Sequence, residues 1–180
     1  MGVAICCVPR WGWIGVGATE QGIAQVVLPR PDRIAVAHRL APFADRTAMA
    51  LADQCAFLLQ RYLCGDAVDL AVVPIDWRVV AAAHKPILQT LQRTVPLGQT
   101  ITYGELARRC GVPRGARLVG QAMAKNPVPL LVPCHRVVRA NGALGGFGGG
   151  LALKARLLAL ERAIATRGKG DSGCCLRSAF

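Results

Sequence analysis

The residue types best suited to chemistry lie at Val132–Arg136, which reads Val-Pro-Cys-His-Arg. An apolar run from Pro127 to Val132 leads into it, and a glycine-rich run from Gly142 to Gly150 follows. Only the thiolate of a cysteine attacks, and a free thiol is mostly protonated at neutral pH. Because glycine lets a planar group approach the backbone closely, the pattern predicts that Cys134 is a thiolate nucleophile beside a pocket, with His135 as its base.

Glu161 is the candidate that would complete a relay. It lies on an expected final helix over 150–164, whose apolar positions follow a helical period. A single inward carboxylate is costly unless it is paired, so we expect Cys134, His135 and Glu161 to form a relay in which the carboxylate fixes the imidazole tautomer. The alternatives are an inert core cysteine, a structural histidine and a solvated glutamate.

The approach to the cysteine contains stiffening residues. Pro127, Pro129 and Pro133 restrict the backbone. Asn126 either caps the preceding helix or braces the turn that carries Cys134. A phosphate-binding loop is the competing interpretation of Gly145–Gly150, but the Gly-Lys-Ser/Thr of a Walker motif is missing.

The elements that must position these residues differ between the two halves of the chain. Trp13–Leu28 predicts two strands joined by a turn at Ala18–Gly22. Thr47–Leu63 has the period of a helix, and Ala71–Ile75 favours another strand. We place a domain boundary near Asp76.

The second half is expected to be helical. A helix is predicted over Val79–Thr94, with Val79, Ala83, Ile87, Leu91 and Val95 on one face. Thr102 and Glu105 fit a capping box, so a helix should run from there to about Cys110. A further short helix over Ala116–Ala124 makes the pair compatible with a helix-turn-helix. Residues from about 166 onward are expected to be a disordered tail.

Charge points to a polyanionic partner. Residues 1–76 hold six Lys and Arg against seven Asp and Glu, whereas residues 77–180 hold sixteen against three. A basic half-chain is typical of nucleic-acid binding first and of anionic membrane binding second. The alternative is a charge that serves solubility.

The eight cysteines show no Cys-x-x-Cys spacing, and the first residues lack the basic region of a signal peptide. The chain also contains no apolar stretch long enough for a membrane helix. We therefore expect a cytoplasmic protein with reduced thiols and no membrane partner. Cys6-Cys7 and Cys174-Cys175 are pairs with a weak potential for metal binding.

The run from Gly98 to Glu161 resembles the O6-alkylguanine-DNA alkyltransferases, the suicide repair proteins. The matching segments are Gly98–Ala107, Ala116–Met123, Asn126–Pro129, Pro133–Val138 and Gly146–Gly150, and Pro-Cys-His-Arg is the most specific of them. The first half resembles the family only loosely, through Glu20–Ile23. The resemblance implies an α/β (α+β) fold: a ribonuclease-H-like strand-and-helix domain over 1–76, and a winged helix-turn-helix-like domain over 77–165, before the tail of 166–180.

The resemblance also implies roles for the site residues. Cys134 would accept the alkyl group from guanine O6 irreversibly, and His135, through a water molecule, and Glu161 would generate its thiolate. Asn126 would hold the turn, and Tyr103 would donate its hydroxyl to the flipped base. The implied partner is double-stranded DNA containing O6-alkylguanine, whereas O4-alkylthymine is left open.

Arg117 would fill the gap that base extrusion leaves in the stack, because O6 cannot be attacked inside a duplex. The expected DNA-binding residues are Arg117, Ala116, Gly120, Arg136 and Arg139. The expected pocket residues are Met123, Val137, Val138, Phe147, Gly148 and Gly149, although the default for such apolar residues is the core.

The chain departs from the family pattern at several positions. Ala83, His84 and Gln89 occupy a region that usually carries a Phe and a Trp, and Phe147 replaces a common Tyr. Thr19 and Ala24 stand at two places where some members have metal ligands. We expect no metal, no cofactor, no obligate protein partner and a monomer.

Three rival functions remain from the sequence. An alkyltransferase-like damage sensor would lack the reactive cysteine, so Cys134 argues against it. A transcriptional regulator would use Arg117 to read base edges in the major groove and would leave the Pro-Cys-His-Arg turn unexplained. A cysteine hydrolase would need an oxyanion hole and turnover.

Overall fold

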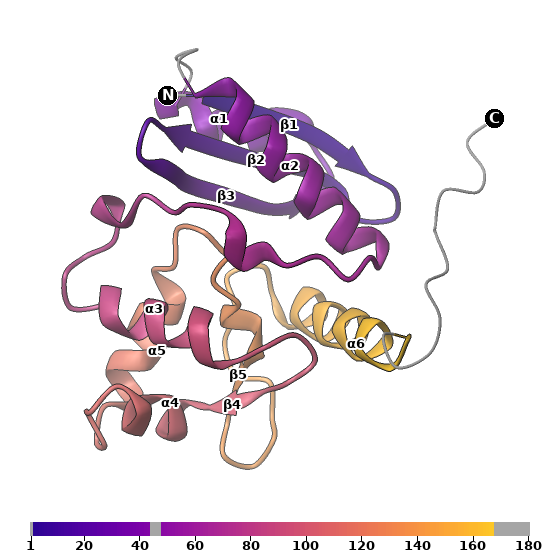
Figure 1. Ribbon diagram of the computed structural model, residues 1–180. Coiled ribbons are helices and arrows are strands. Elements are labelled where there is room, and N and C mark those ends of the chain that lie inside the picture. Colours follow the sequence, from indigo (N-terminus) through magenta and orange to yellow (C-terminus); the bar gives the residue numbers. More distant parts are fainter. Residues whose placement is uncertain (1, 44–47, 168–180) are drawn as a thin grey trace.

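The computed structural model describes residues 2–43 and 48–167. The N-terminal part is a three-stranded antiparallel sheet of β1 (Gly2–Val8), β2 (Gly12–Thr19) and β3 (Gly22–Arg30), in that spatial order (Figure 1). The predicted hairpin of the second and third strands is confirmed, with Glu20 and Gln21 between them. Strand β1, which was not expected from the sequence, pairs with β2 along its whole length.

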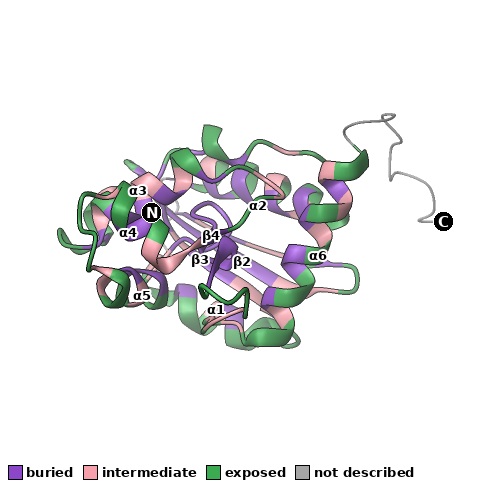
Figure 2. Cartoon of the chain, turned by 90° about the horizontal axis from the view of Figure 1, so that it is seen from below, coloured by how far each residue is buried: buried purple, intermediate pink, exposed green. Residues whose placement is uncertain are grey.

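Two helices cover the sheet on opposite faces, as the view from below shows (Figure 2). Side chains alternate along each strand, so Ala4 and Ile14 belong to the core under α2 (Met49–Cys64), whereas Trp13 packs with α1 (Arg33–Leu40). The predicted helix α2 is confirmed and ends at Gly65, whose φ of 100° suits glycine alone at low cost. Helix α1 was not expected from the sequence, although Asp32 caps it by accepting from the backbone N–H groups of Ile34 and Ala35.

The expected strand at Ala71–Ile75 is wrong. A 3-10 turn at Leu70–Val72 replaces its first half, because the Asp69 side chain accepts from the Ala71 N–H and turns the backbone. Only Ile75 pairs with a strand, through an isolated parallel bridge to Ile23 of β3. A second 3-10 turn follows at Trp77–Val79.

The predicted helix over 79–94 begins later than expected. The structure has α3 at Lys85–Thr94, with Pro86 in its first turn. Proline is tolerated there because the first N–H groups of a helix have no intrahelical partner, but it would break a helix that started at residue 79. Val79 and Ala83 are accordingly exposed, whereas Ile87 and Leu91 are buried.

The short helix pair is confirmed. Helix α4 (Tyr103–Arg109) begins with the predicted capping box, and α5 (Ala116–Ala124) packs against it. In the box, the Glu105 N–H donates to Thr102 Oγ1 at 3.2 Å while Glu105 Oε2 accepts from the Thr102 N–H at 2.9 Å. The C-terminal part therefore presents two short helices next to the glycine-rich loop.

The second half is not purely helical. Strands β4 (Ile101–Thr102) and β5 (Val137–Val138) form a short parallel pair, and α6 (Leu151–Arg167) closes the fold. Helix α6 continues through Thr166 and Arg167, which corrects the expected start of a disordered tail at 166. The rest of the expected tail, with Cys174 and Cys175, lies outside the described residues.

The inner face of α6 differs from the apolar stripe that the sequence suggested. Leu157 and Ile164 are buried as expected, but Leu153 and Leu160 are only half-buried. Lys154 and Glu161 occupy the innermost positions with no exposed surface. The described residues contain no helix that is long and apolar enough to cross a membrane.

We predict that Thr102→Ala lowers the free energy of unfolding by about 1 kcal/mol, because the first turn of α4 loses its cap. Chemical denaturation measures this difference. Thr100→Ala, at an exposed position two residues earlier, is the control and should change stability by much less. Equal losses in the two variants would mean that the capping box does not stabilise the fold.

Candidate active site

Cys134, His135 and Arg136 form one 3-10 turn that β5 follows directly. Pairing of β5 with β4 anchors the end of this turn. The loop before the turn is held by Asn126, whose Nδ2 donates to the Val132 carbonyl at 2.9 Å and whose Oδ1 accepts from the Val128 N–H at 3.1 Å. Asn126 thus braces the loop rather than capping α5, whose C-cap residue is Lys125.

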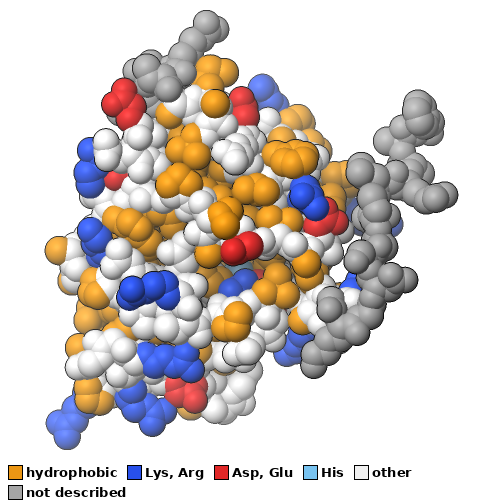
Figure 3. All heavy atoms as spheres, in the orientation of Figure 1, with side chains coloured by type: hydrophobic (Ala, Val, Ile, Leu, Met, Phe, Trp, Pro, Cys, Tyr) orange, Lys and Arg blue, Asp and Glu red, His pale blue; other side chains and the backbone are white. Residues whose placement is uncertain are grey.

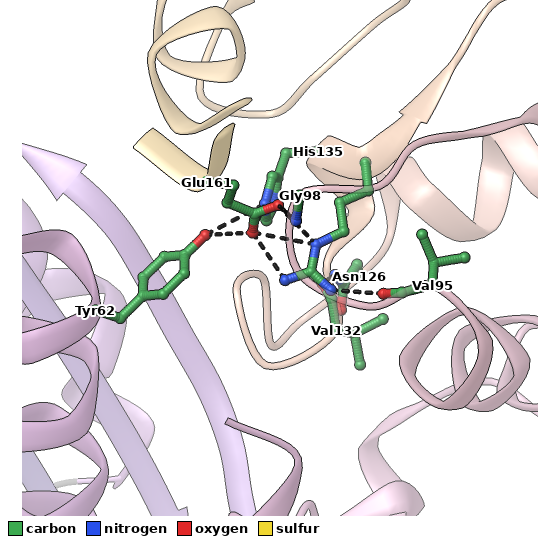
Figure 4. A network of polar contacts seen from close by, with 8 residues as sticks. Tyr62, Val95, Gly98, Asn126, Val132, His135 and Glu161 are labelled. Atoms are coloured by element: carbon green, nitrogen blue, oxygen red, sulfur yellow. Dashed lines mark hydrogen bonds and ion pairs between the residues drawn. The ribbon is translucent and has the colours of Figure 1, made fainter. Parts of the chain in front are cut away.

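Glu161 is the centre of the polar network behind the turn (Figure 4). Its Oε1 accepts from His135 Nε2 at 2.9 Å, from Arg136 Nη2 at 2.8 Å and from Tyr62 Oη at 2.6 Å. Its Oε2 accepts from Arg136 Nε at 2.9 Å and from the Gly98 N–H at 3.2 Å. The structure therefore brings His135 and Glu161 together as expected, and the inward carboxylate is fully paired.

The network keeps Glu161 ionised. Burial alone would raise the pKa of its carboxyl group, but the hydrogen bonds from His135 and Arg136 outweigh burial and hold the pKa at about 2. An ionised carboxylate can only accept, so His135 Nε2 must carry its proton. His135 is thereby fixed in the tautomer whose Nδ1 has a free lone pair.

Burial lowers the pKa of His135, while the hydrogen bond to Glu161 acts in the opposite direction. His135 is therefore a neutral imidazole that can accept a proton. Its Nδ1 is buried and has no hydrogen-bond partner among the described residues. The orphaned atom is the one that a general base would use.

The thiol of Cys134 is also buried, with 6% of its surface exposed. Desolvation raises its pKa above the usual value, and a hydrogen bond from Asn126 and the charge of Lys154 partly oppose this. The resting thiol is thus protonated, and it needs a base to become a nucleophile. This is the chemical reason for the histidine and glutamate behind it.

Lys154 is a functional residue that the sequence analysis missed. Its buried Nζ donates to the Val137 carbonyl at 2.6 Å and to the Leu144 carbonyl, so it ties β5 to the glycine-rich run. It lies two helical turns before Glu161 on the same face of α6. The seven-residue spacing of Lys154 and Glu161 is visible in the sequence, but the leucine and isoleucine positions of the same helix predict an apolar inner face instead.

The predicted pocket beside Cys134 exists, with a volume of about 650 Å³. It lies between the helix pair and the glycine-rich loop, and Cys134 forms part of its wall. The lining residues are Tyr103, Ala116, Gly120, Met123, Ala124, Cys134, Arg139, Gly145, Gly146, Phe147 and Gly148. Gly145 has a φ of 69°, and a Cβ there would lie 2.8 Å from Tyr103 Oη, so glycine is required.

Several expected site residues lie elsewhere. Arg136 was expected to contact DNA, but its guanidinium is buried and is used by Glu161 and by the Val95 carbonyl. Val137 and Val138 were expected in the pocket, but as β5 they point into buried surroundings, in keeping with their apolar default. Gly149 packs near Leu153 and Leu28 and is not part of the pocket wall.

Arg117 and Arg139 are exposed, and Arg117 occupies the second position of α5 next to the pocket residue Ala116. Lys and Arg side chains also gather on the lower part of the molecule over α3 and α4 (Figure 3). Positively charged side chains thus lie on α5 and over α4, the two helices that border the pocket (Figure 3).

Comparison with known proteins gives the class of the C-terminal part. Residues 82–163 match the family model "6-O-methylguanine DNA methyltransferase, DNA binding domain". This stretch contains the helix pair, the Cys134 turn and Glu161. It is a DNA-binding domain of the methyltransferase type.

The relatives carry one shared description. The methylated-DNA–protein-cysteine methyltransferase of Mus musculus is 46% identical over 101 residues, which cover 53% of this chain and 48% of the mouse protein. The protein of the same description from Mycolicibacterium paratuberculosis is 54% identical over 70 residues, which cover 39% of this chain and 42% of the relative. The matched region thus spans less than half of these relatives' length.

Solved structures match over more of the chain. Mycobacterium tuberculosis OGT in complex with DNA superposes with a TM-score of 0.71 at 28% identity, covering 91% of this chain and 94% of that one. An O6-methylguanine-DNA methyltransferase from Pyrococcus kodakaraensis gives 0.70 at 27% identity, with 89% and 98% covered. In sequence over its C-terminal part and in fold over most of its length, the chain is similar to the methylated-DNA–protein-cysteine methyltransferases, the O6-alkylguanine-DNA alkyltransferases.

We predict that Glu161 makes the free energy of unfolding depend on pH. Its pKa is about 2 in the folded protein and lies below the ordinary value of a glutamate, so its stabilisation is complete above about pH 4.5 and is lost as pH falls towards 2. Glu161→Gln should lower the free energy of unfolding at neutral pH by about 3 kcal/mol, since the charge of Arg136 loses its partner.

Denaturation between pH 2 and pH 6 checks this prediction. The free energy of unfolding should fall more steeply with acid in the unmodified protein than in Glu161→Gln. Glu20→Gln, at an exposed glutamate, should keep the slope of the unmodified protein. Parallel curves for the protein and Glu161→Gln would contradict the assignment.

Proposed function

We propose that this protein repairs double-stranded DNA by moving the alkyl group of O6-alkylguanine irreversibly onto Cys134. One observation carries the proposal: the buried Cys134 thiol forms part of a pocket wall in a DNA-binding domain, with the His135–Glu161 pair directly behind it. The descriptions of the relatives support the same activity. The alkylated cysteine would be the end product, because the thioether is stable.

The first step is formation of the thiolate. The Cys134 proton passes through a bridging water molecule to Nδ1 of His135, which is the ring nitrogen without a partner. The imidazolium that forms is stabilised by the Glu161 carboxylate at 2.9 Å. The positive charge of buried Lys154 favours the new thiolate, so both charges of the ion pair are compensated.

The second step is a displacement at the alkyl carbon. The thiolate sulfur forms a bond to that carbon while the bond from the carbon to guanine O6 breaks, and the electron pair stays on the guanine. Tyr103 lines the pocket, and its hydroxyl is available to donate a hydrogen bond to the departing base. The guanine then takes up one proton, which balances the proton that Cys134 released.

The lesion must leave the base stack to reach the pocket. A pocket of about 650 Å³ admits a single base rather than a duplex. Arg117, exposed at the start of α5, would enter the space that the base vacates, and insertion from the minor groove suits binding that does not depend on sequence. The phosphate contacts would come from the basic residues after 76, and we propose Asp76 as the boundary of this domain.

The proposed function predicts a change in the mass of the protein. Incubation with a duplex containing O6-methylguanine should add one methyl group, ~14 Da, to the peptide that contains Cys134. The reaction should stop at one equivalent, because nothing in the described site regenerates the thiol. Peptide mass spectrometry locates the added group, and a mass on another cysteine or repeated turnover would reject the proposal.

Two variants control this experiment. Cys134→Ala should abolish transfer while binding of the lesion duplex is retained, since DNA contacts do not use the thiol. Cys7→Ala removes an exposed cysteine of β1 and should leave transfer unchanged. Loss of both binding and transfer in Cys134→Ala would point to a structural thiol.

The second prediction separates base extrusion from chemistry. Arg117→Ala should slow repair of the duplex by about tenfold or more, while the reaction with free O6-benzylguanine should change little, because only the duplex requires extrusion. Arg162→Ala removes the same charge from an exposed position of α6 and should affect both reactions weakly. Equal losses of both reactions in Arg117→Ala would exclude the extrusion role. Single-turnover kinetics provide the comparison.

A further inference from the structure

One contact to Glu161 comes from outside the matched domain. Tyr62 lies in the last turns of α2, in the N-terminal part, and its side chain is 1% exposed. Its hydroxyl oxygen lies 2.6 Å from Glu161 Oε1 and 3.4 Å from His135 Nε2 (Figure 4). The N-terminal part therefore contributes one polar atom, Tyr62 Oη, that contacts both His135 and Glu161.

Tyr62 can only act as a donor in this contact. Burial and the neighbouring Glu161 charge raise the pKa of its hydroxyl group well above the usual value, so the hydroxyl keeps its proton at neutral pH. Its short distance to an ionised carboxylate is that of a charge-assisted hydrogen bond. The longer approach to His135 Nε2 is not a competing bond, because that nitrogen already donates to Glu161 Oε1.

The same carboxylate oxygen serves as the acceptor for Tyr62, for His135 and for Arg136. Each donor withdraws part of the negative charge on Oε1. The hydrogen bond from Tyr62 compensates part of this charge, so Glu161 stabilises a proton on the imidazole less strongly. Tyr62 is thus positioned to moderate the partner of the general base without touching the substrate pocket, whose wall it does not form.

We propose that Tyr62 is a positioning residue of the alkyl transfer, through which the N-terminal part keeps His135 in the neutral form that accepts the Cys134 proton. The inference rests on the proposed function for its kinetic consequence. Its structural content, a hydroxyl group that tunes His135 through Glu161, holds for the free protein as well.

The other groups that act on His135 define what Tyr62 adds. Glu161 on α6 favours the imidazolium, whereas Arg136 in the same turn and Lys154 on α6 disfavour it. Cys134 is the neighbour that supplies the proton. These charged groups are all retained when the hydroxyl of Tyr62 is removed, so Tyr62→Phe isolates a single hydrogen bond.

The sign of the expected change follows from the shared oxygen. Without the Tyr62 hydroxyl, the charge on Oε1 is less compensated, so the imidazolium becomes more stable and the pKa of His135 rises. A protonated His135 cannot take the proton of Cys134. Transfer in Tyr62→Phe should therefore decline at a higher pH than in the unmodified protein, by ~0.5 to 1 pH unit, and the two proteins should react at similar rates at pH 8.5.

The structure offers a matched control. Thr19 Oγ1 donates to Asp76 Oδ2 at 2.7 Å, so Thr19→Val also deletes a hydroxyl-to-carboxylate bond between distant parts of the chain. It lies away from His135 and Glu161. A loss of stability alone would affect Thr19→Val and Tyr62→Phe alike, whereas only Tyr62→Phe should move the acid limb of the rate profile.

The test uses the full chain in two measurements. Single-turnover transfer from an O6-methylguanine duplex is followed from pH 5.5 to pH 9, and the His135 ring nitrogens are titrated by NMR without DNA, with His135→Gln assigning the signals. An upward shift of the His135 titration and of the acid limb in Tyr62→Phe, with neither in Thr19→Val, is the expected result.

An unchanged or lowered His135 titration in Tyr62→Phe, or an equal upward shift in Thr19→Val, would overturn the proposal. Absence of transfer in the unmodified protein would reject the proposed function instead, and the NMR titration would still decide the role of Tyr62. Thermal unfolding of each variant, monitored by circular dichroism, establishes that it is folded under the conditions used.

Discussion

A carboxylate that is removed from water must be surrounded by donors, or it becomes protonated and loses its charge. Glu161 has no exposed surface, and its donors come from three places in the chain: α2, the loop after α3, and the Cys134 turn, which supplies both His135 and Arg136. The demand for these donors fixes how α6, the active-site turn and the N-terminal part lie relative to one another. The geometry of the site depends on this one buried charge.

The reactivity of Cys134 follows from the same network. Burial keeps the thiol protonated and the imidazole neutral, so neither group is charged at rest. The pair becomes ionic only when the proton moves, and Glu161 and Lys154 are already in place to compensate the two charges. The arrangement suits the proposed function, in which Cys134 reacts once, because an exposed thiolate would be lost to unrelated reactions.

Local rules account for the parts of the structure that the sequence predicted correctly. The capping box at Thr102, the helix at Ala116–Ala124 and the turn at Glu20-Gln21 depend on residues a few positions apart. Missed or misplaced elements had competing local signals. Helix α3 begins next to Pro86, later than expected, and the Asp69 side chain favours a 3-10 turn where a strand was expected. Asp32 is the N-cap of α1, a helix that was not expected.

Sequence alone pointed to Cys134 as the candidate nucleophile, to its histidine and carboxylate, and to the loop that borders the pocket, because residue chemistry and short spacings encode them. Only the tertiary structure decided which side chains surround that carboxylate. The Arg136 side chain points inward to Glu161 instead of outward to solvent, and Tyr62, which lies 99 positions before Glu161 in the sequence, also donates to it. Such contacts arise because a buried charge must be paired with hydrogen-bond donors, which can come from residues far away in the sequence. The linear sequence does not show which of these residues become neighbours in the folded chain.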